Sequence, residues 1–320
     1  MGKVKKILIC GVTGFIGRNI AEYFAKNKEY KVYGVYHQKE PWDCPAITFF
    51  RADLREKSQV ARVIQGMDII IQAAATTSGS KDIISQPYVH VTDNAVMNSL
   101  IFRAAYDAKV RHVFFFSCGV MYQPGNRPRK EQDFNVGDEM VPQYFGVGWT
   151  KVYIEKMCEF YARISETKYT VLRQSNIYGP HDKYDYEHSH MFGATVRKVT
   201  DAKDGDSIVV WGEGKESRDL LHVDDVVSFV DMALEKQREK FQLCNVGYGQ
   251  AFSVNEIVRK VIDASGKDLT ICHDVSKPSI PTNLCFDIER AKELFGWKPK
   301  VSITEGIEKT LQWYWSIRRS

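Results

Sequence analysis

The stretch Lys5-Lys-Ile-Leu-Ile-Cys-Gly11-Val-Thr-Gly14-Phe-Ile-Gly17 decides the fold. A short apolar run, typical of a strand buried in a parallel sheet, leads into three glycines and then into a helical pattern. Glycine is needed where a turn is tight, where the backbone approaches a pyrophosphate and where the helix packs closely on its strand. A tight turn without a ligand is the competing interpretation. We predict a dinucleotide site whose coenzyme contacts include Gly11, Thr13, Gly14, Phe15, Ile16 and Gly17.

Strand and helix patterns alternate through the first half of the chain. Strand patterns occur at 31–36, 47–50, 68–72, 113–116 and 171–173, and helical patterns occur between them at 58–65, 92–109 and 147–165. This alternation predicts an α/β fold, a Rossmann-type doubly wound parallel sheet with helices on both faces. After Tyr178 the elements become shorter, so we predict an NAD(P)-binding domain over 1–175 and a smaller α/β substrate lobe over 176–320, with some segments returning to the first domain.

The composition argues against several classes of protein. Lys and Arg number 44 and Asp and Glu 40 among 320 residues, so the net charge is 44 − 40 = +4, and no nucleic-acid partner is expected. No apolar run approaches the ~18 residues that a membrane span needs, so no membrane association is expected. Seven cysteines lie scattered without a CxxC pair, which predicts free thiols in the cytoplasm and no metal site.

The second strand pattern ends in Val35-Tyr36-His37-Gln38-Lys39. An acid at this place usually binds the ribose 2′-hydroxyl of NAD, and none is present. A 2′-phosphate prefers a cation, so His37 and Lys39 weakly favour NADP, although both side chains also suit a solvated surface. The sequence leaves the choice between NAD and NADP open.

Six ordered motifs resemble the extended short-chain dehydrogenase/reductase family of nucleotide-sugar enzymes. They are residues 13–17, 53–54, 72–75, 173–180, 218–225 and 295–299. The resemblance implies NAD or NADP as hydride carrier, a nucleotide-sugar substrate and a homodimer formed through the helices predicted at 92–109 and 147–165. Apolar faces on these helices would also suit a core. Further coenzyme contacts implied by the resemblance are Asp53, Leu54, Ala73, Ala74 and Ala75.

Within this family the segment Gly179-Pro-His-Asp-Lys-Tyr184, followed by Ser189-His190, is most similar to the GDP-fucose synthase group. That similarity implies a GDP-linked sugar and hydride transfer at its C4. It also implies that Asn176 and Arg218 face the diphosphate and that His190 binds the sugar or acts as a base. The structural alternatives are Asn176 in a turn, Arg218 paired with Asp224 or Asp225, and His190 as an ordinary loop residue. We further expect Trp211 in the core and His222 as a helix cap.

The catalytic tyrosine of the family is missing. The family carries Ser or Thr followed by Tyr-x-x-x-Lys, in which the tyrosine exchanges the substrate proton and the lysine lowers the tyrosine pKa and binds the nicotinamide ribose. Here Lys151 is present, but Val147 stands four residues before it, and Val120 replaces the cysteine of the epimerising pair. We expect Lys151 to keep the ribose contact. The proton-transfer group stays open among water, Ser117, Cys118, Tyr122, Tyr144, Thr150 and His190.

Three functions follow from these residues. The favoured one is an NAD(P)-dependent oxidoreductase on a nucleoside-diphosphate sugar. An epimerase or dehydratase of the same family is the second, although Gly119-Val120 stands where a dehydratase carries Asp-Glu. The third is a catalytically inactive NAD(P)-binding sensor or partner subunit, which Val147 and Cys118 would suit.

Overall fold

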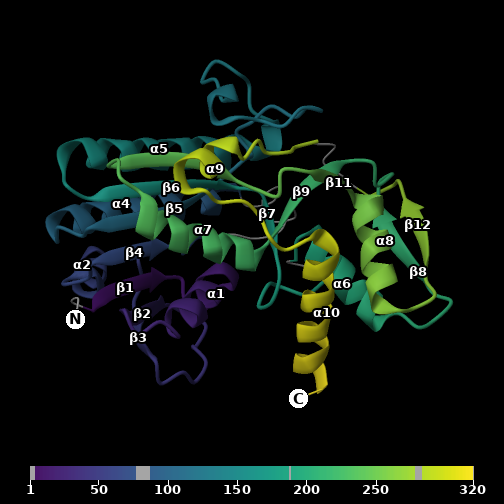
Figure 1. Ribbon diagram of the computed structural model, residues 1–320. Coiled ribbons are helices and arrows are strands. Elements are labelled where there is room, and N and C mark those ends of the chain that lie inside the picture. The colour runs from purple at the N-terminus through teal and green to yellow at the C-terminus, as the bar shows by residue number, and fades with distance from the viewer. Residues whose placement is uncertain (1–3, 77–86, 187–188, 278–282, 320) are drawn as a thin grey trace.

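The computed structural model describes residues 4–76, 87–186, 189–277 and 283–319, and Figure 1 shows a large sheet beside a smaller lobe. The large sheet has seven strands in the order β10-β6-β5-β4-β1-β2-β3. Every neighbouring pair in it is parallel, which confirms the predicted doubly wound α/β fold. The strands are β1 (Lys5–Cys10), β2 (Tyr30–Tyr36), β3 (Ile47–Arg51), β4 (Ile69–Gln72), β5 (His112–Cys118), β6 (Lys168–Gln174) and β10 (Phe241–Val246).

Helices cover both faces of the large sheet. One face packs against α1 (Phe15–Phe24), α7 (Val223–Lys236) and α9 (Glu289–Phe295). The other packs against α2 (Lys57–Ile64), α4 (Pro87–Asp107) and α5 (Phe145–Ile164). The central strands β1 and β4 are buried on both sides, which explains their unbroken apolar sequences. Burial of these two apolar layers is the main stabilising contribution to the sheet.

The smaller lobe has its own core, formed by residues such as Phe192, Ile257 and Leu311. A three-stranded sheet contains β7 (Asn176–Tyr178), β9 (Ser217–His222) and β11 (Ala251–Ser253), and a separate parallel pair contains β8 (Ser207–Trp211) and β12 (Thr270–Asp274). The helices are α6 (Met191–Asp201), α8 (Val254–Ser265) and α10 (Ile303–Arg319). Residues 296–302 separate α9 from α10.

The chain returns to the large sheet after it has entered the smaller lobe. Strand β10 pairs in parallel with β6, with Phe241 opposite Tyr169 and Val246 opposite Gln174. Trp297, which is fully buried, donates from its indole nitrogen to the carbonyl of Asp225 at 3.1 Å. The motif at 295–299 therefore fixes the segment after α9 against α7 rather than forming part of a ligand site.

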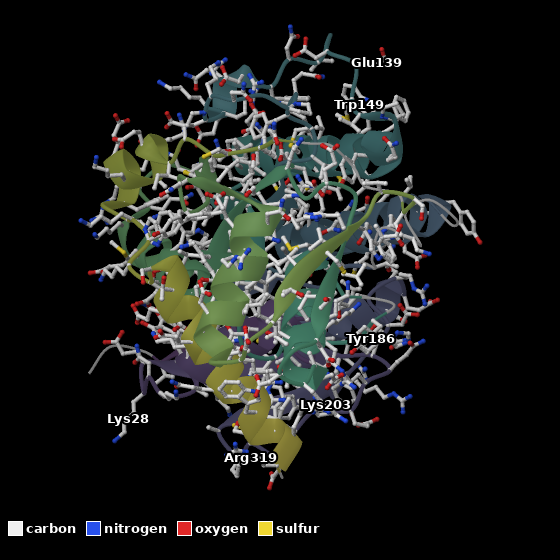
Figure 2. All side chains as sticks on the ribbon, turned by 90° about the vertical axis from the view of Figure 1, so that its right-hand side faces the viewer. Lys28, Glu139, Trp149, Tyr186, Lys203 and Arg319 are labelled. Atoms are coloured by element: carbon white, nitrogen blue, oxygen red, sulfur yellow. The ribbon has the colours of Figure 1, made fainter. Side chains whose placement is uncertain are left out.

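A long segment between β5 and α5 projects beyond the sheet, and Figure 2 shows Glu139 and Trp149 at that end of the molecule. It contains two short 3-10 turns, η1 (Glu131–Asp133) and η2 (Pro142–Tyr144). Met121 and Met140 form a small apolar cluster with Val152 of α5. This packing sets the path by which the chain enters α5, where Lys151 lies.

Within the described ranges, no helix has both the length and the apolar character that crossing a membrane requires. The same ranges contain no group of three or more His, Cys, Asp or Glu residues that could hold a metal ion. All seven cysteines are free thiols.

Candidate active site

A cavity of about 1430 Å³ lies at the carboxyl ends of the parallel strands and extends into the smaller lobe. Ligand pockets for a single small molecule typically measure roughly 300–1,000 Å³, so this cavity has room for more than one ligand. Its lining comes from β1, β2 and β4 on one side and from β8, β9 and α6 on the other. In open parallel sheets this edge is the usual place for ligands.

The glycine loop forms one arm of the cavity. Gly11 has a φ of +76°, and a Cβ there would lie 2.7 Å from the Cα of Ala74, so a side chain does not fit. Gly14 starts α1 without a side-chain cap, so the N–H groups of the first turn have no side-chain acceptor. Gln72 also borders this arm, and its buried Oε1 atom, an acceptor, has no hydrogen-bond partner among the described residues. An anionic dinucleotide fits the N–H donors at the start of α1 and the space of this arm.

The predicted coenzyme residues lie together in this arm, with one exception. Those that line the cavity are Gly11, Thr13, Gly14, Phe15, Ile16, His37, Asp53, Leu54, Ala73, Ala74, Ala75 and Lys151. Gly17 is the exception, because it is not among the residues that line the cavity. A Cβ on Gly17 would lie 2.3 Å from the carbonyl oxygen of Gly11. Gly17 therefore allows α1 to pack closely against its strand.

Charged side chains gather at the far end of this arm, after β2 and β3. Arg55 donates from NH2 to the Asp53 carboxylate at 2.8 Å, and the His37 ring lies 3.7 Å from the same carboxylate. The hydrogen bonds from Arg55 lower the pKa of Asp53 to about 2. Lys39 borders the same end of the cavity. Sequence reasoning missed Arg55, although its place directly after the Asp-Leu pair was a usable signal.

Lys151 points from α5 into the cavity. Its Nζ donates to the carbonyl oxygen of Phe116 at 2.7 Å, which fixes the ammonium at the end of β5. Burial lowers the pKa of Lys151. Val147, one turn earlier on the same helix, is not among the residues that line the cavity.

Ser117 and Tyr122 belong to a buried polar network instead of the cavity lining. The Ser117 hydroxyl donates to Glu155 at 2.6 Å, and the Tyr122 hydroxyl donates to Asn245 at 2.7 Å. Arg173 joins the two, because it donates to Glu155 at 2.7 Å and to the Tyr122 oxygen at 2.9 Å. Both hydroxyls therefore have fixed structural partners.

Two further candidates for proton transfer also lie outside the cavity lining. The Cys118 thiol is next to the Ser117 network, and burial raises its pKa. The Thr150 hydroxyl donates within α5 to the carbonyl of Gly146 at 2.8 Å. Tyr144 and His190, by contrast, both line the cavity.

The second arm of the cavity is formed by the smaller lobe. Asn176, His190 and Arg218 all line it, as the sequence predicted for a substrate site. Asn176 donates to the carbonyl of Asp219 at 3.2 Å. His190 stands at the start of α6, and burial followed by the charge of Lys183 lowers its pKa. A neutral imidazole at this place can bind a sugar hydroxyl or accept a proton.

Asp224 and Asp225 have partners other than Arg218. The carboxylate of Asp224 lies 3.6 Å from Lys309, and the carboxylate of Asp225 accepts the backbone N–H groups of Lys300 and Val301. His222 caps α7 by accepting the N–H of Asp224, which confirms the prediction of a helix cap. Arg218 lines the cavity, and its guanidinium donates to the carbonyl of Ser217 at 3.0 Å.

The expectation that Trp211 lies in the core is wrong. Its side chain is 49% exposed and borders the cavity at the end of β8. Lys198 of α6 lies beside it and donates to the carbonyl of Val209 at 2.7 Å. Burial alternates along β8, so every second side chain leaves the core, but the sequence Ser207-Ile-Val-Val-Trp211 does not show this alternation.

The segment that follows β7 joins the two arms. Asn19 of α1 donates to the carbonyl of Pro180 at 2.8 Å, and Glu22 of α1 lies 3.5 Å from the His181 ring. That ring also contacts Trp313 of α10, with the ring centroids 5.0 Å apart. Hydrogen bonding from His181 and then from Arg18 lowers the pKa of Glu22 to about 2. The glycine-loop helix is thus tied directly to the smaller lobe.

A glycine loop at the strand ends, facing a cation-bearing second lobe across one cavity, defines a class of two-lobed enzymes that use a dinucleotide coenzyme. The sequence profile of the NAD dependent epimerase/dehydratase family matches residues 7–247, and the chain belongs to this family. The resemblance drawn from the six motifs is thereby confirmed, and the coenzyme is of the NAD type.

Curated relatives and solved structures agree with this family. The chain is 28% identical over 314 residues to GDP-L-colitose synthase of Yersinia pseudotuberculosis, covering 97% of each protein. It is 29% identical to GDP-L-fucose synthase of Azorhizobium caulinodans, covering 98% of this chain and 97% of the relative. A UDP-glucose 4-epimerase of Thermotoga maritima, solved with UDP-glucose, has the same fold, with a TM-score of 0.85, 24% identity and coverage of 98% and 99%. MoeE5 in complex with UDP-glucuronic acid and NAD also shares it, with a TM-score of 0.83, 20% identity and the same coverage.

Proposed function

We propose that the protein is an NAD(P)-dependent oxidoreductase that transfers a hydride at C4 of a nucleoside-diphosphate sugar, with GDP as the nucleotide. One observation carries this proposal: a single cavity joins the glycine loop, Lys151 and the cation-bearing arm of the smaller lobe. The GDP-L-colitose and GDP-L-fucose synthases that the chain resembles over nearly its whole length support the GDP-linked substrate.

In this proposal the coenzyme arm of the cavity positions the coenzyme relative to the sugar. A nicotinamide coenzyme bound there would supply or accept the hydride. The backbone of Gly11 and Gly14 would hold its pyrophosphate, and Lys151 would hold its nicotinamide ribose. At the other end, the cations Lys39 and Arg55, with His37 beside them, suit a 2′-phosphate. Asp53 suits a free ribose hydroxyl, so both coenzymes enter the assay.

The smaller lobe binds the nucleotide sugar. The guanidinium of Arg218 gives charge-assisted hydrogen bonds to the diphosphate, with Asn176 beside it. Trp211 offers its exposed ring face to the nucleobase, and Lys198 adds positive charge at the same wall. His190 binds the sugar. Val120 in place of the second epimerising residue favours simple hydride transfer over combined epimerisation and reduction.

The assay follows the absorbance of NADH or NADPH while GDP-linked and UDP-linked 4-ketosugars are offered to the purified protein. We expect the reduced coenzyme to be consumed, and the GDP-linked sugars to be used in preference to their UDP counterparts. An isomerised sugar without net change in the coenzyme would replace this proposal with an epimerase. Coenzyme binding without turnover on any sugar would replace it with an inactive NAD(P)-binding protein.

The organisation of the chain follows from the same arrangement. Residues 1–175 form the coenzyme domain and residues 176–320 the substrate lobe, apart from α7, β10 and α9, which cover or extend the large sheet. Seven free thiols suit the reducing cytoplasm, where nucleotide sugars are available.

Helices α4 and α5 form the interface of a homodimer. Large apolar side chains stay exposed along them, including Val96, Tyr106, Tyr153, Phe160 and Ile164. Two helices from each subunit would bury this face in a four-helix bundle.

Phe160→Glu should convert the dimer to a monomer, because the 54% exposed phenylalanine lies on the proposed interface and a buried carboxylate is costly there. Sedimentation velocity should give twice the 36.7 kDa chain mass for the wild-type protein and the single chain mass for the variant. Val275→Glu changes a 73% exposed residue far along the chain from these helices and should stay dimeric. A monomeric wild-type protein would contradict the interface.

A further inference from the structure

We propose that Tyr144 donates the proton to the sugar C4 carbonyl oxygen, in place of the tyrosine that the family carries at position 147. This proposal rests on the proposed function and names the acid that completes it. Tyr144 stands directly before α5, seven residues ahead of Lys151, and both side chains line the same cavity. The valine at 147 lies between them in sequence but does not line the cavity.

The other hydroxyls near the end of β5 have partners that occupy them. Ser117 donates to Glu155, Tyr122 donates to Asn245, and Thr150 donates to a carbonyl of its own helix. The hydroxyl of Tyr144 makes no hydrogen bond to the part of the chain that the structure describes. It is therefore available to a ligand in the cavity.

The local chain path explains how Tyr144 reaches this position. The 3-10 turn Pro142–Tyr144 precedes α5, and the N–H of Tyr144 donates to the carbonyl of Val141 at 2.8 Å. Tyr144 then leaves the helical conformation, with φ −102° and ψ 1°. Because Tyr144 lies outside the helix, its side chain does not have to project from the face of α5 that positions 147 and 151 share. It can therefore approach the cavity from the end of the helix.

Charge and burial around Tyr144 suit an acid better than a base. Burial raises the pKa of Tyr144, and the positive charge of Arg218 partly offsets this increase. The hydroxyl is therefore protonated at neutral pH, and the guanidinium stabilises the tyrosinate that forms after donation. The ammonium of Lys151 is held by the Phe116 carbonyl at the end of β5. The arrangement favours reduction of a ketone over oxidation of an alcohol.

Reduction of the ketone requires one hydride at C4 and one proton at the carbonyl oxygen. A bound, reduced coenzyme would supply the hydride with its two electrons to sugar C4 and would itself be oxidised. As the ketone is reduced to an alcohol, the Oη–H bond of Tyr144 breaks and its proton bonds to the carbonyl oxygen. The Tyr144 oxygen then regains a proton from water. His190, on the substrate arm of the cavity, binds the sugar without supplying this proton.

The test is Tyr144→Phe, which removes only the hydroxyl. We expect kcat for ketosugar reduction to fall at least ~100-fold, while KM and coenzyme affinity stay within about threefold of the wild-type values. The control is Tyr30→Phe. Tyr30 is the first residue of β2, so its hydroxyl lies at the amino ends of the strands, away from the cavity, and its loss should leave kcat unchanged. The wild-type rate should fall at high pH as Tyr144 loses its proton, and Tyr144→Phe should lack this dependence.

A readout without turnover uses the coenzyme-free protein. The ultraviolet difference spectrum between wild-type protein and Tyr144→Phe should show one tyrosine that ionises above the ordinary value of about 10. Unchanged turnover in Tyr144→Phe would overturn the assignment, and so would loss of coenzyme binding in this variant. The assignment would also fail if His190→Gln, and not Tyr144→Phe, removed the fall of the rate at high pH. A wild-type protein that reduces no ketosugar would overturn the proposed function, and the role of Tyr144 with it.

Discussion

Lys151→Met should lower kcat/KM for ketosugar reduction by about 10³-fold, the largest loss of activity that we expect from one substitution. Lys151 lines the cavity at the end of β5, where we propose that the coenzyme ribose and the reacting carbon of the sugar meet. Methionine fills a similar volume without charge, so the protein should fold while the ribose contact is lost. Steady-state kinetics and calorimetric coenzyme binding measure the two effects separately.

Lys156→Met is the matched control for this substitution. Lys156 lies on the same helix, its side chain is 71% exposed, and it forms an ion pair with Glu159 on the surface. We expect its kinetics to equal those of the wild-type protein. Full activity in Lys151→Met would remove Lys151 from the site and, with it, the proposed arrangement of the coenzyme.

Glu155→Gln should lower the free energy of unfolding by about 3 kcal/mol, the largest stability effect that we expect from a change of charge alone. Glu155 and Arg173 are only 4% and 5% exposed and form an ion pair at 2.7 Å. Burial by itself would lower the pKa of Arg173, but the hydrogen bonds and charge of Glu155 raise it overall. Removing the carboxylate therefore leaves a buried guanidinium with only neutral partners.

Urea denaturation compares this variant with Glu159→Gln. Glu159 lies one turn later on α5 and pairs with Lys156 and Arg163, both of which are largely exposed. A surface pair of this kind contributes at most about 1 kcal/mol. Equal midpoints for the two variants would show that the buried network does not stabilise the segment between β5 and α5.

The sequence predicts the parts of this molecule that depend on local patterns. Each central strand of the large sheet is a short apolar run, and the helices follow a separate period, so the alternation specifies a parallel sheet. The glycine loop is also a local pattern, because Gly17 is required by its close approach to Gly11 within the loop, although Gly11 itself also packs against the distant Ala74. The two predicted halves of the cavity then meet because all parallel strands end at one edge.

The parts that escaped prediction depend on contacts between distant segments. The hydroxyl of Ser117 is bound by Glu155, 38 residues further along the chain, and no sequence pattern links the two. Trp211 is exposed because β8 belongs to a two-stranded sheet with β12, far along the chain, and one face of the strand borders the cavity. Tyr144 reaches the cavity because the chain makes a 3-10 turn before α5, which the helical pattern at 147–165 does not reveal.

The central claim is that the glycine loop binds a nicotinamide coenzyme, and calorimetric titration of NADH and NADPH into the wild-type protein and Gly14→Ala tests it most directly. Gly14 has a φ of −82°, which alanine also adopts, but the added Cβ would lie 3.2 Å from the backbone oxygen of Gly11, so the loop has to shift by a few tenths of an ångström while the rest of the fold should persist. We expect this shift and the added methyl group to weaken the contacts between the loop backbone and the coenzyme. We predict binding to the wild-type protein and a loss of about 100-fold in the variant, equal to about 2.8 kcal/mol. Absence of binding to the wild-type protein, or equal affinity in both proteins, would contradict the account.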